Sequence, residues 1–211
     1  MPESLRVEGP SGPLEALLEM PVDRPAPCAF GVVCHPHPLF GGTMTNKVAH
    51  TVARAFTAHG AATLRFNFRG VGASAGSYDD GRGETDDLLA VVGYARARFP
   101  DLPLWLGGFS FGSFVALRGH SAAGAARLVT IAPPVGRWDF GGLEPPRCPW
   151  LVVQGDQDDL VDHRAVAQWL APMPAAPRLV LLAGAEHFFH GRLHEVKSAI
   201  ADFLLDARAP S

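Results

Sequence analysis

Short hydrophobic runs alternate along this chain with longer segments of helical periodicity. Six runs have the length and apolar character of buried strands: Ala29 to Cys34, Ala62 to Phe68, Leu104 to Gly107, Leu128 to Ala132, Trp150 to Gln154 and Arg178 to Leu182. Five segments have helical spacing: Lys47 to His59, Glu84 to Phe99, Phe111 to His120, Arg164 to Leu170 and Leu193 to Ala207. This alternation predicts an α/β fold, with a mostly parallel central sheet and helices on both faces.

Two parts of the chain depart from that alternation. Leu5 to Val7 and Leu14 to Met20 flank the turn sequence Gly-Pro-Ser-Gly-Pro, which predicts an N-terminal antiparallel hairpin at one edge of the sheet. Pro133 to Pro149 joins two strands, is rich in Pro and Gly, and lacks helical periodicity, so we expect no cap domain there. The final Ala-Arg-Ala-Pro-Ser is expected to be a frayed end.

Composition narrows the class of protein. A chain of 211 residues with 47% hydrophobic content fits one globular domain, expected to span residues 1–211. The chain has 18 basic and 21 acidic residues, which gives a net charge of -3. This charge offers no broad basic surface for nucleic acid or an anionic membrane. The expected partner is therefore a small molecule. The sequence has neither a secretory signal pattern nor an uninterrupted apolar window of about 18 residues, so we expect a cytoplasmic protein.

Cysteine and histidine spacing bears on redox state and metals. Three cysteines cannot all pair within the chain and form no zinc pattern, so they are expected to be reduced packing residues: Cys28, Cys34 and Cys148. Two sets of histidines have spacings that could hold a metal: His35 with His37, and His187 with His190 and His194. No cysteine or H-E-x-x-H pattern accompanies them, so no metal is expected.

The pattern G-x-S-x-G occurs twice, around Ser110 and around Ser74. This pattern is typical of a sharp strand-to-helix turn that lifts a serine hydroxyl above a sheet. Ser110 follows an apolar strand and precedes a helical segment, whereas Ser74 has loop residues on both sides. Ser110 is therefore the predicted nucleophile, against the alternative that it only caps the following helix.

A serine nucleophile needs a histidine to take its proton and a carboxylate to orient that histidine. In enzymes with this turn the acid and then the base follow the serine. Four aspartates come after the strand Trp150 to Gln154: Asp156, Asp158, Asp159 and Asp162. Asp162 directly precedes a helix and is expected to be its N-cap, while Asp156 and Asp159 also fit solvated turn carboxylates. The residues alone do not decide the acid.

Four histidines follow the aspartates and are candidates for the base: His163, His187, His190 and His194. His187 is favoured because only a short link separates it from the strand Arg178 to Leu182. His190 and His194 lie at or inside the last helix and are expected to be surface residues.

These motifs together resemble the α/β-hydrolase family, in particular its small bacterial serine hydrolases without a lid. The resemblance covers nearly the whole chain and includes four segments besides GFSFG: Cys34 to Gly42, Arg65 to Ser74, Gly155 to Val161 and Gly184 to Phe189. The family pattern G-x-x-D-x-x-V places the acid on Asp158, although Asp162 stands where the family usually has proline. Ser74 falls in the family's R-G-x-G-x-S loop, which agrees with its rejection as nucleophile.

The resemblance implies hydrolysis of a small carboxylic ester through an acyl-enzyme, with Ser110, Asp158 and His187 as the triad and no cofactor. An amide, a peptide or a thioester would use the same residues. A catalytically silent binding module on the same fold is the alternative of a different class. Family lipases usually carry a helical cap in the place of Pro133 to Pro149, so its absence implies short acyl groups, with Trp138 and Phe140 as residues that could form a small flap.

The segment His35 to Gly42 resembles the family's oxyanion loop, with Pro36 where glycine is common. Proline has no N–H, so three backbone donors remain to pair with that of Phe111: the N–H groups of His37, Leu39 and Phe40. Leu39 is the expected second donor. The imidazoles of His35 and His37 are expected to anchor the loop through hydrogen bonds.

Overall fold

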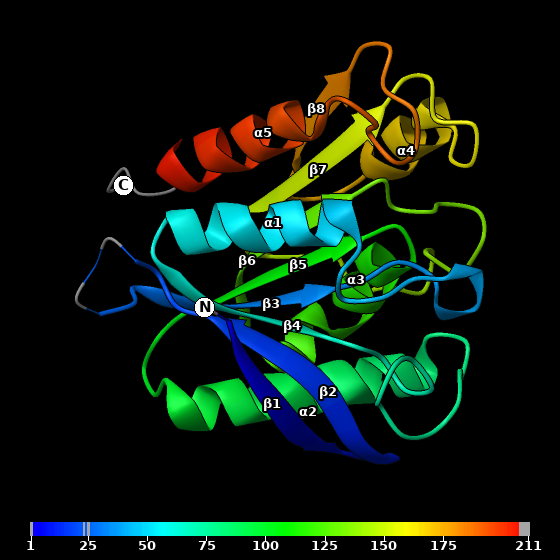
Figure 1. Ribbon diagram of the computed structural model, residues 1–211. Coiled ribbons are helices and arrows are strands. Elements are labelled where there is room, and N and C mark those ends of the chain that lie inside the picture. The colour runs from blue at the N-terminus through cyan, green and yellow to red at the C-terminus, as the bar shows by residue number, and fades with distance from the viewer. Residues whose placement is uncertain (1, 23, 25, 207–211) are drawn as a thin grey trace.

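An eight-stranded sheet forms the centre of the computed structural model, which describes residues 2–22, 24 and 26–206 (Figure 1). The strand order is β1-β2-β4-β3-β5-β6-β7-β8. Strands β1 to β2 and β2 to β4 pair antiparallel, and all other neighbours are parallel. The strands are β1 (Glu3–Gly9), β2 (Gly12–Glu19), β3 (Ala29–Cys34), β4 (Ala61–Phe66), β5 (Leu104–Phe109), β6 (Ala125–Ile131), β7 (Trp150–Gly155) and β8 (Arg178–Leu182).

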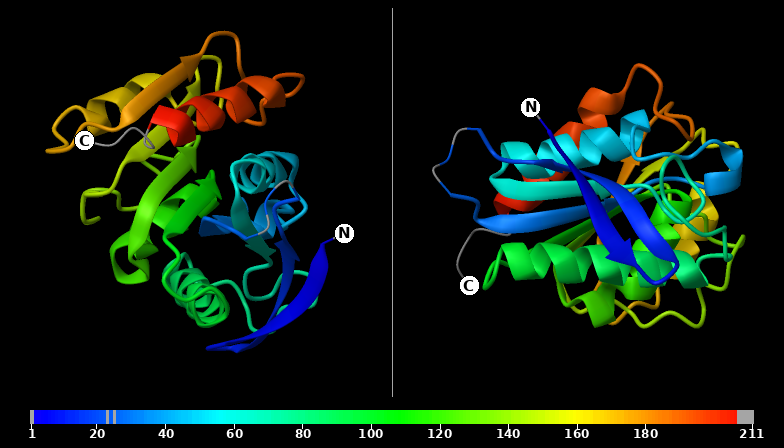
Figure 2. Two further views of the ribbon diagram at one scale, coloured as in Figure 1. Left: turned by 90° about the vertical axis from the view of Figure 1, so that its left-hand side faces the viewer. Right: turned by 60° about the horizontal axis from the view of Figure 1, so that its bottom comes forward.

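Helices cover both faces of this sheet (Figure 2). Their bounds are α1 (Lys47–Ala58), α2 (Arg82–Arg98), α3 (Phe111–Ala123), α4 (His163–Leu170) and α5 (Leu193–Asp206), with a short 3-10 helix η1 at Pro38–Phe40. Buried side chains of α1 and α5 form one core, and those of α2, α3 and α4 form the other. The predicted α/β fold is confirmed. Positions 207–211, where the expected end of the last helix and the frayed end fall, lie outside the described residues.

The N-terminal hairpin occupies the predicted edge of the sheet. Gly9 and Gly12 form the last pair of the ladder, and Gly12 has φ 108°, a conformation that glycine adopts without a steric penalty. Every second residue of β2 points into the core, because alternate side chains of a strand face opposite sides: Leu14, Ala16 and Leu18.

Several element boundaries differ from the sequence expectation, and two of these differences have an identifiable cause. Strand β4 stops at Phe66 because the next backbone groups bond elsewhere; the N–H of Phe68 donates to His35 Nε2 at 3.1 Å. Helix α2 begins at Arg82, earlier than expected, because the buried carboxylate of Glu84 accepts the N–H groups of Gly81 and Asp79 at 2.8 and 2.9 Å. A carboxylate at this position of a helix caps its start.

The segment between β6 and β7 contains no helix among the described residues, as expected. Phe140 is buried and packs against Phe114 and Trp169, so the segment lies on the domain and does not form a cap. None of the helices in the described ranges is long and apolar enough to cross a membrane. Because parallel strands end at one edge, the loops after β3, β5, β7 and β8 meet there.

Candidate active site

Ser110 lies between β5 and α3, at the strand-to-helix turn that the sequence predicts. Its φ of 52° and ψ of -120° are rare for a residue with a side chain, and such a conformation costs about 1–3 kcal/mol. The flanking glycines make the turn possible. A Cβ at Gly108 would collide with the backbone of Gly112, and one at Gly112 would collide with the carbonyl oxygen of Cys34.

Ser74 is a buried residue in a partly exposed turn, with no strand directly before it and no helix directly after it. Its hydroxyl donates to the carbonyl oxygen of Asn67 at 2.7 Å and accepts the N–H of Glu15 at 2.9 Å. Both hydrogen-bonding functions of the hydroxyl are therefore used within the fold. The rejection of Ser74 agrees with this geometry.

The structure brings together Ser110, His187 and Asp158, although they come from three loops. The distance from His187 Nε2 to Ser110 Oγ is 3.0 Å, and that from His187 Nδ1 to Asp158 Oδ2 is 2.8 Å. The imidazole is 3% exposed and packs against the rings of Phe109 and Phe188. A neutral imidazole with its proton on Nδ1 donates to Asp158 and leaves Nε2 free to accept the serine proton.

The Asp158 carboxylate is held by several donors. Oδ1 accepts the N–H groups of Leu160 and Val161 at 2.9 and 2.8 Å, and Oδ2 accepts Gln154 Nε2 at 2.9 Å besides His187. Burial by itself raises the pKa of Asp158, but the hydrogen bond from His187 and those from the backbone outweigh it, so the pKa lies below its ordinary value. The carboxylate is thus ionised and can only accept hydrogen bonds.

The other three aspartates of this loop accept backbone hydrogen bonds or are exposed to solvent. Asp156 accepts the N–H of Gly184 at 2.6 Å, Asp159 is exposed, and Asp162 caps α4 by accepting the N–H of Arg164 at 2.9 Å. The expected N-cap is confirmed. Of the four aspartates, Asp158 is the one whose carboxylate reaches His187.

The other histidines lie outside this arrangement. His190 and His194 are exposed, as expected, and their nearest acidic partners are Glu186 at 2.8 Å and Glu195 at 4.0 Å. Within the described part of the chain, no group of three or more His, Cys, Asp or Glu side chains could hold a metal ion. The three cysteines are free thiols.

The loop after β3 is anchored by His35, which is completely buried. Its Nδ1 donates to the carbonyl oxygen of Pro36 at 2.6 Å, and its Nε2 accepts the N–H of Phe68. Burial lowers the pKa of His35 to about 4, so the ring is neutral and its two nitrogens keep these roles. The anchoring role expected for His35 is confirmed.

The Leu39 N–H, expected to be the second oxyanion donor, already has an acceptor within its own loop. The sequence analysis did not foresee η1, in which His37 is the N-cap and its Nδ1 accepts the Leu39 N–H at 3.2 Å. The N–H of Phe40 donates to the His37 carbonyl oxygen at 3.1 Å. Of the three candidates in the described loop, only the His37 N–H has no acceptor recorded. A signal was available, because proline often occupies the first position of a helix and Pro38 follows His37.

A chain of side chains that the sequence analysis missed fixes the His37 ring. His37 Nε2 lies 3.3 Å from the hydroxyl of Tyr78, which donates to Asp80 Oδ1 at 3.0 Å. Trp138 Nε1 donates to the same oxygen at 3.0 Å. Hydrogen bonds from Trp138 and Tyr78 hold the pKa of Asp80 below its ordinary value. Three loops far apart in the sequence are thereby joined beside Ser110.

A cavity of about 430 Å³ opens at Ser110, a size typical of small-molecule sites. Its walls are mostly apolar, and Leu39 is not among them. The lining residues are Pro36, His37, Phe40, Gly41, Gly42, Asn46, Ser110, Pro134, Arg137, Trp138, Leu160, Val161, His187 and Phe188.

Comparisons with known proteins agree with this fold and arrangement. The structure resembles that of an α/β serine hydrolase without a lid from Xanthomonas campestris, with 43% identity, a TM-score of 0.94, and coverage of 100% of this chain and 96% of the other. An α/β serine hydrolase homologue from Coxiella burnetii has 41% identity and a TM-score of 0.91, with 95% and 96% covered.

A curated but uncharacterised protein of Rickettsia prowazekii is 33% identical over 207 residues, which cover 93% of this chain and 86% of the relative. The family model described as "Alpha/beta hydrolase domain" matches residues 40–203. The chain therefore belongs to the α/β-hydrolase family and is a hydrolase without a lid.

Proposed function

We propose that this hydrolase cleaves small carboxylic esters through an acyl-enzyme formed on Ser110. The observation that carries the proposal is the unbroken series of hydrogen bonds from Ser110 Oγ through His187 to Asp158. His187 takes the hydroxyl proton as Ser110 attacks the ester carbonyl, and then gives it to the leaving alkoxide. Water, activated by the same histidine, releases the acid and restores the serine. Asp158 holds the ring in its tautomer and stabilises the imidazolium.

The oxyanion donors in this proposal are the backbone N–H groups of Phe111 and His37. Phe111 is the first residue of α3, and the first N–H groups of a helix have no acceptor within it. His37 lines the cavity beside Ser110, and its N–H is the one left over by the bonds within η1. Prolines on both sides of His37 limit the backbone's conformations and so preorganise this donor.

Short acyl groups are the substrates that this site suits. The cavity has a wall at Trp138, whereas Phe140, the other residue of this segment that could have formed a flap, is buried in the core. Each methylene contributes about 0.8 kcal/mol of affinity only where a wall buries it. An acyl chain that outgrows the cavity therefore gains little from further length.

We further propose that the protein acts in the cytoplasm. Its three cysteines are free, and Cys34 is completely buried between core residues. Thiols that are not paired are usual where the surroundings are reducing.

The test of the proposed reaction is rapid-mixing kinetics with 4-nitrophenyl esters of acetate, butyrate, octanoate and palmitate. An acyl-enzyme predicts a burst of one nitrophenolate per protein when deacylation is slow. The specificity constant is expected to peak at acetate or butyrate. A maximum at palmitate would contradict the size argument, and no turnover of any ester by folded protein would contradict the proposed function.

A further inference from the structure

One permanently charged side chain faces the cavity at Ser110. Among the described residues that line it, Arg137 is the one with a charge that neutral pH does not remove, and no carboxylate joins it there. Four large apolar side chains also line the cavity: Phe40, Trp138, Leu160 and Phe188. Arg137 is exposed, so water partly screens its charge, but among the described lining residues its guanidinium is the fixed positive charge available to an anion that enters the cavity.

The Arg137 side chain is held in place from both ends. Its backbone N–H donates to the carbonyl oxygen of Pro134 at 3.1 Å, which closes a turn, and Nη2 donates to the carbonyl oxygen of Leu160 at 3.3 Å. The neighbouring Trp138 is fixed by its bond to Asp80. The turn therefore places Arg137 in the lining of the cavity, beside Leu160.

Arg137 has donors to spare. A guanidinium carries five N–H groups, and the structure records one acceptor for them, a neutral carbonyl. Within the described residues, no carboxylate forms an ion pair with Arg137. Burial lowers the pKa of His37, Asp80 opposes this shift, and the charge of Arg137 adds to it. The field of Arg137 therefore reaches the loop beside Ser110.

We propose that the substrate is an ester that also carries a carboxylate, and that Arg137 binds this carboxylate while Ser110 attacks the ester. A guanidinium matches a carboxylate with two parallel hydrogen bonds. A single positive charge balances a carboxylate, whereas a phosphate monoester carries about two negative charges and nothing else in the lining offers a second cation. This inference rests on the proposed function, since it names the substrate class of the same site.

The test compares two esters that differ in one charge, the 4-nitrophenyl ester of adipic acid with its second carboxyl free and the same ester with that carboxyl methylated. The readout is the ratio of their kcat/KM values, free over methylated. We expect a ratio above one for the wild type, and a fall of about tenfold in Arg137→Gln, the size of a lost charge-assisted hydrogen bond. Arg137→Lys should keep part of the preference, and added salt should reduce it.

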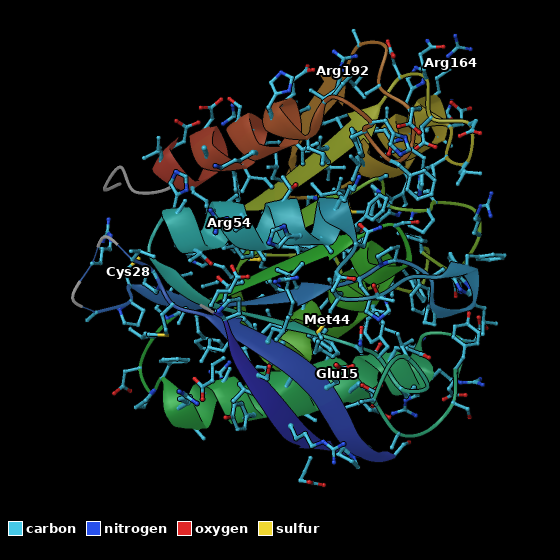
Figure 3. The ribbon with its side chains drawn as sticks, in the orientation of Figure 1. Glu15, Cys28, Met44, Arg54, Arg164 and Arg192 are labelled. Atoms are coloured by element: carbon cyan, nitrogen blue, oxygen red, sulfur yellow. The ribbon has the colours of Figure 1, made fainter. Side chains whose placement is uncertain are left out.

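The matched control is Arg164→Gln, which removes the same charge from the first turn of α4. Arg164, labelled in Figure 3, is exposed and does not line the cavity. This variant should keep the wild-type ratio. An equal loss of preference in both variants would mean that net charge alone matters, and a wild-type ratio of one would mean that Arg137 binds no carboxylate; either result overturns the inference.

A binding measurement separates this inference from the proposed function. Ser110→Ala is titrated by calorimetry with monomethyl adipate and with dimethyl adipate, and then again with Arg137→Gln added. Tighter binding of the monomethyl compound that Arg137→Gln abolishes supports the inference even if the wild type hydrolyses neither nitrophenyl ester. Equal binding of both compounds overturns it, even if both nitrophenyl esters are hydrolysed.

Discussion

The two G-x-S-x-G segments of this chain share a pattern and differ in almost everything else. Around Ser110, strand β5 runs straight into α3, the backbone is strained, and the hydroxyl meets His187. Around Ser74, the chain makes a turn in which Ser74 is buried, and the hydroxyl bonds to the backbone of Asn67 and Glu15. The pattern therefore leaves a serine free to react only where a strand and a helix meet at it.

The Ser74 segment has a supporting task. It follows Asn67 and Phe68, whose amide and backbone groups hold the loop after β3: Asn67 Oδ1 accepts the N–H of Met44 at 2.8 Å, and the Phe68 N–H donates to His35. The Glu15 carboxylate accepts a hydrogen bond from Asn67 Nδ2 at 2.8 Å; Glu15 and Met44 are labelled in Figure 3. The Ser110 segment thus supplies the reactive hydroxyl, and the Ser74 segment supports the loop after β3 that faces this hydroxyl.

The largest expected difference between the segments is in turnover. Ser110→Ala should lower kcat for 4-nitrophenyl acetate by about 10⁶-fold, as loss of a triad nucleophile does elsewhere. Ser74→Ala should lower it by less than about threefold, because its hydroxyl makes only structural hydrogen bonds. Steady-state kinetics on proteins whose circular dichroism matches the wild type provides the check. Similar losses in the two variants would remove the distinction drawn between the serines.

The next effect concerns the acid. Asp158→Asn should reduce kcat by about 10⁴-fold, since an amide in this position stabilises the wrong tautomer of His187. Asp156→Asn is the matched control, because an amide oxygen can still accept the N–H of Gly184, and less than about tenfold should be lost. If Asp156→Asn proved the more damaging substitution, the acid would be misassigned.

His35, which anchors the loop after β3, should make the stability of the protein depend on pH. The pKa of His35 in the folded protein is about 4, below the value of about 6.5 in an unfolded chain. Between these two pH values the unfolded state binds more protons than the folded state, so the free energy of unfolding rises with pH. The contribution of neutral His35 to that free energy is fully present above about pH 6.5. His35 should therefore account for a loss of about 3 kcal/mol between pH 7 and pH 4.

Urea denaturation at several pH values measures this loss. His35→Gln keeps one donor and one acceptor without titrating in this range, so its stability should change less with pH than that of the wild type. Parallel curves for the two proteins would show that His35 is not the group responsible.

The smallest effects should have opposite signs at the two serines. Ser74→Ala leaves the Glu15 N–H without its acceptor and should reduce the free energy of unfolding by about 1–3 kcal/mol. Ser110→Gly should raise it by about 1 kcal/mol, because glycine adopts positive φ without strain. Urea midpoints at pH 7 compare the two. If Ser74→Ala raised the free energy of unfolding, or Ser110→Gly lowered it, the contrast between a hydrogen-bonded turn at Ser74 and a strained turn at Ser110 would be contradicted.

The local pattern of apolar and polar residues predicted the helices and strands more completely than it predicted the residues of the candidate active site. Runs such as Trp150 to Gln154 mark strands because burial on both faces leaves a continuous apolar stretch. Ser110 was identified because it lies just beyond such a run. His187 was identified because it follows Arg178 to Leu182, which was expected to be a buried strand but is the partly exposed edge strand β8. Asp158 needed the resemblance, since the spacing alone suits any of several aspartates in that loop.

What the sequence could not predict depends on contacts between distant loops. The Leu39 N–H is used by a side chain two residues away, and the bonds among His37, Tyr78, Asp80 and Trp138 join positions up to 58 residues apart. The place of Arg137 in the wall of the cavity follows from the packing of its loop, and not from any local periodicity.

The most direct test of the central claim is covalent labelling with a fluorophosphonate, followed by mass spectrometry of the peptides. We expect one adduct per chain, on the peptide that contains Ser110, in the wild type and in Ser74→Ala. Ser110→Ala should take up none. An adduct on Ser74, or no adduct in a folded wild-type protein, would contradict the assignment of Ser110 as the activated nucleophile.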